Sequence, residues 1–97
     1  MKALSKMEVE EFLSDNLKNW SFDGNCLKRD FKFKTFVEAF SFMTAIAIEA
    51  EKIDHHPDWS NVYNSVRINL STHDAKGITK LDFDLADVID RVFENYK

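Results

Sequence analysis

Three pairs of residues carry the spacing of a helix N-terminus, and they set the order in which structural elements can follow one another along this chain. In each pair a hydroxyl residue precedes a carboxylate residue by three positions. The pairs are Ser5 with Glu8, Thr35 with Glu38, and Thr79 with Asp82. Such a capping box satisfies backbone N–H groups that a helix start leaves without partners. The sequence therefore predicts helices over residues 6–17, 36–53 and about 80–96.

The segments between these helices alternate apolar and polar residues, as strands with one buried face do. Two short runs, residues 20–22 and 27–33, flank the turn sequence Asp23-Gly24-Asn25 and predict a β-hairpin. Residues 61–71 are also strand-like, and a turn near residues 64–65 would split them into two strands. The apolar residues that share one parity in this stretch are Val62, Val66, Ile68 and Leu70. Of these, Val66, Ile68 and Leu70 are expected to face the helices.

The predicted order of elements is α-β-β-α-β-β-α, in one domain over residues 1–97. One-sided alternation is typical of an antiparallel sheet with one face on the helices and the other face open. The chain is therefore expected to be α+β, with a four-stranded antiparallel sheet. A domain of 97 residues has room for a single core, but it is small enough that oligomerisation would add stability.

Composition and charge exclude several classes of function. The 13 basic and 17 acidic residues leave a formal net charge of −4, so no basic surface for nucleic acid is evident. Cys26 is the only cysteine, which excludes an intrachain disulfide and a zinc site built from thiolates. No apolar run approaches the length of a membrane span, and the N-terminus does not resemble a leader peptide. We therefore expect a cytoplasmic protein.

The middle helix is apolar over well more than half of its circumference, whereas a surface helix needs an apolar stripe of only about 100°. The centre of its apolar arc comprises Phe36, Phe40, Met43 and Ala47. One flank comprises Phe42, Ile46 and Ile53, and the other comprises Val37 and Ile48. In so small a domain, a second copy of the chain is the natural cover for the surplus. We therefore predict a homo-oligomer formed through this helix. The candidate interface residues are Phe42, Ile46 and Ile53 on one flank and Val37 and Ile48 on the other, and Ile46 is the residue chosen for a test. Glu51 also projects within the arc, so it needs a partner or a function.

All three histidines lie at predicted element ends, where side chains can converge on a small site. His55 and His56 follow the middle helix and precede Pro57, and His73 follows the last strand. Histidine alone has an unperturbed pKa near neutral pH, so this group is suited to proton transfer. A histidine at a helix C-terminus also interacts favourably with the helix dipole, which is the structural alternative.

Two other kinds of site have less support. Three imidazoles with Glu51 or Asp54 behind them could bind a metal, but adjacent histidines rarely chelate one ion and no familiar zinc spacing is present. Cys26 has no basic neighbour in the sequence that would activate it as a nucleophile. General acid–base chemistry without a cofactor remains. Residues with a structural role by default are Asp82, in its capping box, and the aromatic residues Trp20 and Trp59.

The histidines also belong to a longer sequence signature. Its central segment runs from Glu51 to Trp59 and contains His55-His56-Pro57. The further segments are Asn61-Val62-Tyr63, Ser71-Thr72-His73, Gly77-Ile78-Thr79, Asp82 and Leu85-Ala86, with Trp20, Phe31, Phe33, Phe36 and residues 39–43 upstream. Together and in this order they resemble the pterin-4a-carbinolamine dehydratase family. The resemblance covers nearly the whole chain.

This resemblance implies a four-stranded antiparallel sheet with three helices on one face, in agreement with the element order above. It also implies dimers or tetramers, with tetramers joined through the middle helix. The family dehydrates 4a-hydroxytetrahydropterin to quinonoid dihydropterin and so recycles the cofactor of aromatic amino-acid hydroxylation. Some relatives also bind a homeodomain transcription factor. The alternative function is therefore a non-catalytic assembly or coactivator module of the same fold, with a regulatory protein as partner.

The resemblance also implies roles for individual residues. The three histidines form the catalytic set, in which His55 and His73 would be the acid–base pair and His56 would chiefly bind the pterin substrate. The remaining residues are the pterin-binding Glu51, Ser71 and Thr72, Asp54 to orient a histidine, Trp59 to cover the flat ring, and Asp82 and Trp20 in support. The resemblance implies no metal and no cofactor. The net negative charge argues against nucleic acid as a direct partner, and the lack of a long apolar run argues against a membrane.

Overall fold

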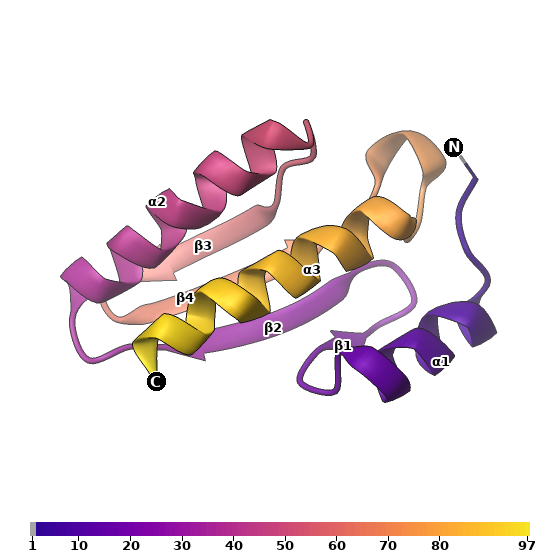
Figure 1. Ribbon diagram of the computed structural model, residues 1–97. Helices are drawn as coiled ribbons and strands as arrows, with labels where there is room; N and C mark the ends of the chain where they lie inside the picture. The colour runs from indigo at the N-terminus through magenta and orange to yellow at the C-terminus, as the bar shows by residue number, and fades with distance from the viewer. Residues whose placement is uncertain (1) are drawn as a thin grey trace.

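The structure is a computed structural model that describes residues 2–97, and its elements follow the predicted order (Figure 1). The helices and strands are α1 (Lys6–Asn16), β1 (Ser21–Phe22), β2 (Leu27–Lys32), α2 (Phe36–Lys52), β3 (Asp58–Val62), β4 (Ser65–Leu70) and α3 (Lys80–Phe93). Two 3-10 turns, η1 (His73–Ala75) and η2 (Glu94–Tyr96), follow β4 and α3. The predicted order α-β-β-α-β-β-α is confirmed.

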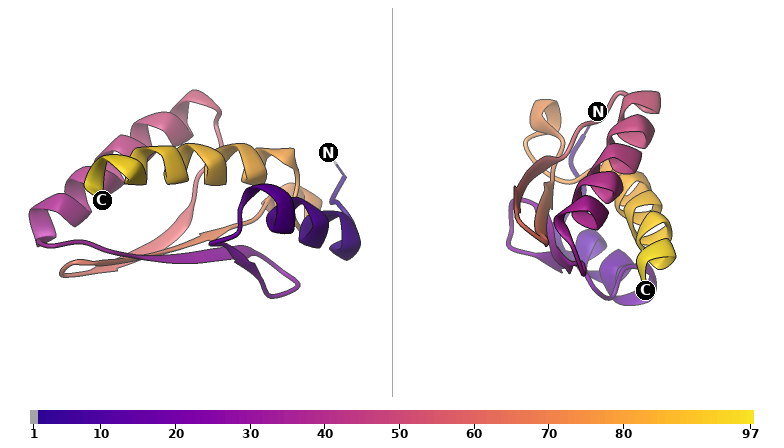
Figure 2. Two further views of the ribbon diagram at one scale, coloured as in Figure 1. Left: turned by 60° about the horizontal axis from the view of Figure 1, so that its bottom comes forward. Right: turned by 90° about the vertical axis from the view of Figure 1, so that its left-hand side faces the viewer.

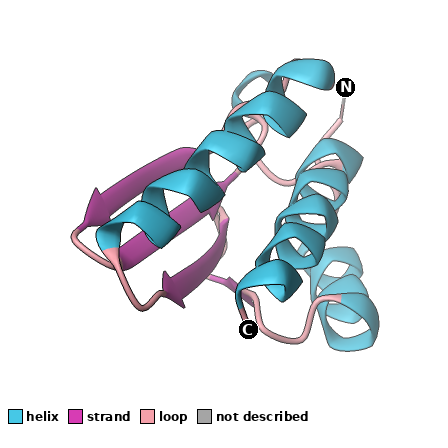
Figure 3. Cartoon of the chain, turned by 60° about the vertical axis from the view of Figure 1, so that its left-hand side comes forward, coloured by secondary structure: helices cyan, strands magenta, loops and turns pink. Residues whose placement is uncertain are grey.

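The four strands form one antiparallel sheet in the order β1-β2-β4-β3. β2 and β4 are the central pair, and their register runs from Leu27 opposite Leu70 to Lys32 opposite Ser65. The three α-helices lie on one side of the sheet, with α2 and α3 across its middle and α1 beside its β1 end (Figure 2, Figure 3). The other face of the sheet is open, as the alternation predicts.

Hydrogen bonds at the helix starts explain where the helices begin. The predicted capping boxes of α1 and α3 are both complete. At the start of α2, Thr35 Oγ1 accepts from the Glu38 N–H at 3.1 Å, but the Glu38 carboxylate accepts from the Lys34 N–H instead of completing the box. α2 ends at Lys52, and Pro57, which disfavours helical geometry at His56, keeps the helix from continuing through the two histidines.

The core lies between the sheet and the helices. Val66, Ile68 and Leu70 of β4 are at most 1% exposed, so this strand faces the helices as predicted. From the helix layer, Phe42 and Ile46 of α2 are fully buried. These two rows of side chains fix α2 against the sheet and thereby position the chain that follows the helix.

β3 differs from the prediction in its first residue, and its last residue lies on the open face of the sheet. It begins at Asp58, earlier than expected, because Trp59 already pairs with Ile68 on the helix-facing side. Val62 pairs with Ser65 across a two-residue turn and is 77% exposed. Val62 therefore does not lie on the buried face, although it has the same sequence parity as Val66. Paired residues in an antiparallel ladder lie on the same face, so Val62 follows Ser65 to the open side.

α2 buries Phe42 and Ile46 within the same chain, half-buries Met43 and leaves several other residues of its apolar arc exposed. Phe42 and Ile46 pack into the core, so the prediction that their flank forms an intermolecular interface is wrong. The exposed apolar residues of the helix, here called the α2 stripe, are Phe36 (48% exposed), Val37 (75%), Phe40 (55%) and Ile48 (55%). Although α2 is apolar, none of the helices within residues 2–97 has the length and apolar character needed to cross a membrane.

Candidate active site

The candidate site lies where the end of α2 meets the loop that follows β4. After α2, Asp54 adopts a left-handed conformation with φ 52°, which turns the chain. The backbone N–H of His55 donates to Ala50 O at 3.1 Å and fixes this histidine beside the last helical turn. The two adjacent histidines lie in different environments, because His55 is only 8% exposed whereas His56 is exposed.

Asp82, in the first turn of α3, is the partner of His55. His55 Nε2 and Asp82 Oδ1 lie 2.6 Å apart, and Asp82 is fully buried. The other carboxylate oxygen, Oδ2, accepts from the Thr79 N–H and from the Thr72 hydroxyl, both at 2.9 Å. Asp82 thus caps α3, as its capping box predicts, and also contacts a candidate catalytic histidine. A carboxylate in this position fixes the orientation of an imidazole.

Thr72 joins the loop that carries His73 to this buried pair. Its backbone N–H donates to Gly77 O at 2.8 Å, and its carbonyl accepts from the Gly77 N–H at 3.4 Å. These two hydrogen bonds close the turn that contains η1, where His73 is exposed. The Thr72 hydroxyl donates to Asp82, which in turn contacts His55. One threonine and one aspartate therefore connect the two segments that carry His55 and His73.

His56 and Glu51 form a second, exposed histidine–carboxylate pair. His56 Nε2 lies 2.9 Å from Glu51 Oε1, and the two side chains are 57% and 79% exposed. The carboxylates within hydrogen-bonding distance of the adjacent histidines are thus Asp82 for His55 and Glu51 for His56. Asp54, which the sequence places as the orienting carboxylate, contributes instead a backbone turn, and its N–H donates to Glu51 O at 3.2 Å.

The other residues expected at the site occupy different positions. Trp59 is half-buried on β3 and packs against the core, and Ser71 is exposed just after β4. Trp20 is buried, and its indole N–H donates to Asp90 Oδ1 at 2.8 Å. Asp90 lies about two turns of α3 beyond Asp82, roughly 12 Å along the helix axis. Trp20 is therefore anchored to a part of α3 away from the histidine pair.

The donor set favours proton transfer over metal binding or nucleophilic attack. Within residues 2–97, no three His, Cys, Asp or Glu side chains gather as metal ligands do. Burial, together with the nearby Asp23 carboxylate, raises the pKa of the Cys26 thiol and so lowers its thiolate fraction. The site offers two histidine–carboxylate pairs, one buried and one exposed, and Thr72 joins the buried pair to the loop that carries the exposed His73.

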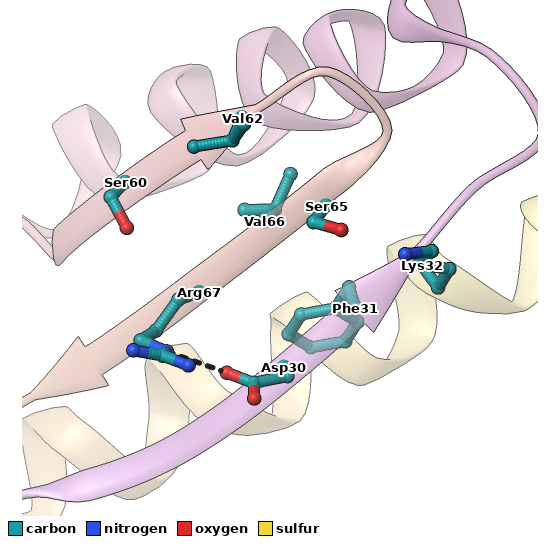
Figure 4. A pocket seen from close by; sticks show the side chains of 8 residues that line it. All are labelled: Asp30, Phe31, Lys32, Ser60, Val62, Ser65, Val66 and Arg67. Atoms are coloured by element: carbon teal, nitrogen blue, oxygen red, sulfur yellow. Dashed lines mark hydrogen bonds and ion pairs between the residues drawn. The ribbon is translucent and has the colours of Figure 1, made fainter.

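A separate hollow lies on the open face of the sheet, between side chains of β2, β3 and β4 (Figure 4). Its volume is about 430 Å³. Arg67 Nε and Asp30 Oδ1 form an exposed ion pair across it at 3.1 Å, and Ser60 and Ser65 lie at its edge. Its lining residues include no histidine, and Asp30 pairs with Arg67, so this hollow lacks the imidazoles of the candidate site.

Fold and site together define a small α+β protein with a buried histidine–carboxylate pair between α2 and α3. The family model described as "Pterin 4 alpha carbinolamine dehydratase" matches residues 2–92 of the chain. The chain therefore belongs to the pterin-4-alpha-carbinolamine dehydratase family. The resemblance found in the sequence is confirmed.

Relatives of similar length agree with this assignment. A protein of Prochlorococcus marinus (strain NATL2A), named "Putative pterin-4-alpha-carbinolamine dehydratase", is 47% identical over 95 residues, which are 98% of this chain and 99% of the relative. A protein of Mesorhizobium japonicum with the same name is 51% identical over 94 residues, 95% of each chain. The crystal structure of a transcriptional coactivator/pterin dehydratase from Brucella melitensis has a TM-score of 0.88 and 42% identity. The similarity covers 94% of this chain and 98% of that one.

Proposed function

We propose that this protein is a dehydratase that converts 4a-hydroxytetrahydropterin to quinonoid dihydropterin and water by histidine acid–base catalysis. The observation that carries the proposal is the contact of 2.6 Å between His55 Nε2 and the fully buried Asp82, beside the loop of His73. A buried carboxylate that holds an imidazole is a recurrent support for a histidine that transfers protons. Membership of the family supports the substrate class.

The reaction needs one acid and one base. Hydroxide is a poor leaving group near neutral pH, so an acid must protonate the C4a hydroxyl as the C4a–O bond breaks. A base must remove the proton from N5 as the double bond between C4a and N5 forms, so that one molecule of water leaves and the protons balance. We assign these two steps to His55 and His73, each of which can give or take a proton near neutral pH.

The exposed pair of His56 and Glu51 is proposed to bind the substrate. A carboxylate accepts hydrogen bonds, and a pterin ring carries amino and amide N–H donors that need acceptors. Because 79% of the Glu51 side chain is exposed, Glu51 can exchange its contact with His56 for a contact with a ligand. The residues proposed to complete the pocket are Asp54, Trp59, Ser71 and Thr72.

Turnover of chemically generated 4a-hydroxytetrahydropterin tests this function. Folded protein should accelerate the loss of the 4a-hydroxy species well above its spontaneous rate. The rate should persist after dialysis against a chelator, because acid–base catalysis by histidine needs no metal. Absence of any acceleration by folded protein would contradict the dehydratase proposal. Activity that is lost on chelation and restored by zinc would contradict the metal-free mechanism.

We also propose that a second copy of the chain covers the α2 stripe. The four apolar residues of the stripe are 48–75% exposed, and soluble monomers rarely leave large contiguous apolar patches uncovered. In a two-fold contact both copies use the same stripe, so each buries the apolar surface of the other. The alternative occupant is a regulatory protein, because the Brucella melitensis relative is named a transcriptional coactivator as well as a pterin dehydratase.

A further inference from the structure

A chain of hydroxyl groups ends at the carboxylate that contacts His55. Thr72 Oγ1 donates to Asp82 Oδ2 at 2.9 Å and lies 2.7 Å from Thr79 Oγ1. A hydroxyl has one proton to donate, and Thr72 gives its proton to Asp82. The Thr79 hydroxyl must therefore donate to Thr72, while it accepts from the Leu81 N–H at 3.3 Å. Counting one proton for each hydroxyl group thus fixes the direction of the hydrogen bonds that link Thr79, Thr72 and Asp82.

The two carboxylate oxygens of Asp82 have different hydrogen-bond partners. Oδ2 accepts from the Thr72 hydroxyl and the Thr79 N–H, while Oδ1 lies 2.6 Å from His55 Nε2. The contact at Oδ1 has a single proton, which sits either on His55 Nε2 or on the carboxyl group. Two donors already occupy Oδ2, so Oδ1 is the carboxylate oxygen that accepts from the ring. The proton then sits on His55 Nε2, and Nδ1 is the ring nitrogen left for a ligand.

We propose that Thr72 is a positioning residue for the reaction: through Asp82 it holds His55 with a proton on Nε2, so that Nδ1 exchanges the proton with the substrate. The exchange with substrate rests on the proposed function, whereas the tautomer is a property of the free protein. Thr72 also pairs with Gly77 and closes the turn that carries His73. One residue therefore sets both the proton position on His55 and the placement of the second catalytic histidine.

A purely structural role for Thr72 leads to different expectations. Its hydroxyl would then serve only to satisfy the carboxylate that caps α3, and its loss would lower stability without changing the His55 ring. Thr72→Val keeps the β-branched shape and the backbone pairing with Gly77 but removes the hydroxyl. Thr72→Ser keeps the hydroxyl and removes the methyl group. Comparison of these two variants separates the hydroxyl from the rest of the side chain.

Long-range 1H–15N NMR of the His55 ring tests the tautomer without substrate, in labelled protein at a pH at which the ring is neutral. We expect the Nε2-protonated form in wild type and in Thr72→Ser, and a mixture of tautomers in Thr72→Val. A wild-type ring protonated mainly on Nδ1 would overturn the proposal, whatever the activity of the enzyme. An unchanged His55 ring in folded Thr72→Val would also overturn it. The wild-type measurement decides alone if Thr72→Val does not fold.

Steady-state kinetics on the same variants give the second readout. Outer-shell partners that orient metal-bound histidines typically contribute 10–100-fold, so we expect Thr72→Val to lower kcat by about that factor, with a smaller effect on KM. Thr72→Ser should recover most of the lost kcat. Wild-type kcat in Thr72→Val, or no recovery in folded Thr72→Ser, would overturn the positioning role. An inactive wild type with the Nε2-protonated ring would instead overturn the proposed function and leave the tautomer assignment standing.

Discussion

Arg29 on β2 and Asp90 on α3 form an ion pair on the helix-facing side of the sheet, with Arg29 Nη1 and Asp90 Oδ1 2.6 Å apart. Their side chains are 12% and 25% exposed. The guanidinium carbon lies 4.5 Å from the centre of the Phe31 ring, and the Trp20 indole donates to the same Asp90 oxygen. One carboxylate therefore joins β2, α3 and the residue that precedes β1.

Asp90→Ala should lower the free energy of unfolding by about 2–4 kcal/mol, because it leaves a largely buried guanidinium and an indole N–H without their acceptor. Urea unfolding followed by circular dichroism measures this loss. Asp87→Ala is the matched control, since it removes an exposed pair with Arg91 on the same helix and should cost less than about 1 kcal/mol. Equal losses in the two variants would contradict a role for Asp90 in the core.

A charge on the α2 stripe should have a different effect from a charge on the buried flank of α2. An unpaired charge in an interface is costly, so Ile48→Glu should dissociate the oligomer while the fold is kept. Ile46 is fully buried in the core of its own chain, so Ile46→Glu should unfold the protein. Light scattering and far-UV circular dichroism distinguish these outcomes. A wild-type protein that stays monomeric at high micromolar concentration would contradict the proposed oligomer.

The β1–β2 hairpin should lose stability in acid. Hydrogen bonds from the backbone N–H groups of Cys26 and Asn25 hold the pKa of Asp23 well below its ordinary value of 3.8. Lys28, paired with Asp23 at 3.0 Å, adds to this effect. A carboxylate whose pKa is lower in the folded chain than in the unfolded chain contributes its full stabilisation at a pH above the unfolded-state pKa. This contribution is lost as the pH falls through the folded-state pKa.

The test compares thermal unfolding of wild type and Asp23→Ala over a range of pH. Their difference in stability should be constant above about pH 5 and shrink steadily below about pH 4, because the unfolded chain takes up a proton there before the folded chain does. A difference that stays constant down to the acid limit of the experiment would mean that Asp23 is not held in its charged form.

The order of elements could be predicted because its signals are local. A capping box involves near neighbours, as Thr79 and Asp82 do at the start of α3. The predictions fail where distant partners decide the outcome. β3 begins at Asp58, earlier than the sequence predicts, because Trp59 pairs with Ile68 across the turn. A helical wheel assigns Ile46 to the apolar arc of α2, but it cannot show which part of that arc the chain's own sheet covers.

The histidines of the candidate site could be found from the sequence, but their contacts could not. His55 and His73 stand out because histidine is suited to proton transfer and both follow regular elements. The contact between His55 and Asp82 joins residues 27 positions apart, and no local pattern signals it. The capping box already gives Asp82 a sufficient role, so its second contact becomes evident only in the folded chain.

Turnover by His55→Ala and His73→Ala tests the proposed chemistry most directly. The substrate is chemically generated 4a-hydroxytetrahydropterin, and the spontaneous reaction is subtracted at each concentration. We predict that each variant lowers kcat by about two to four orders of magnitude, the usual contribution of a group that transfers a proton. His56→Ala should mainly raise KM, and Asp87→Ala should leave both parameters unchanged. Near-wild-type kcat in folded His55→Ala and His73→Ala would contradict the assignment of the acid–base pair.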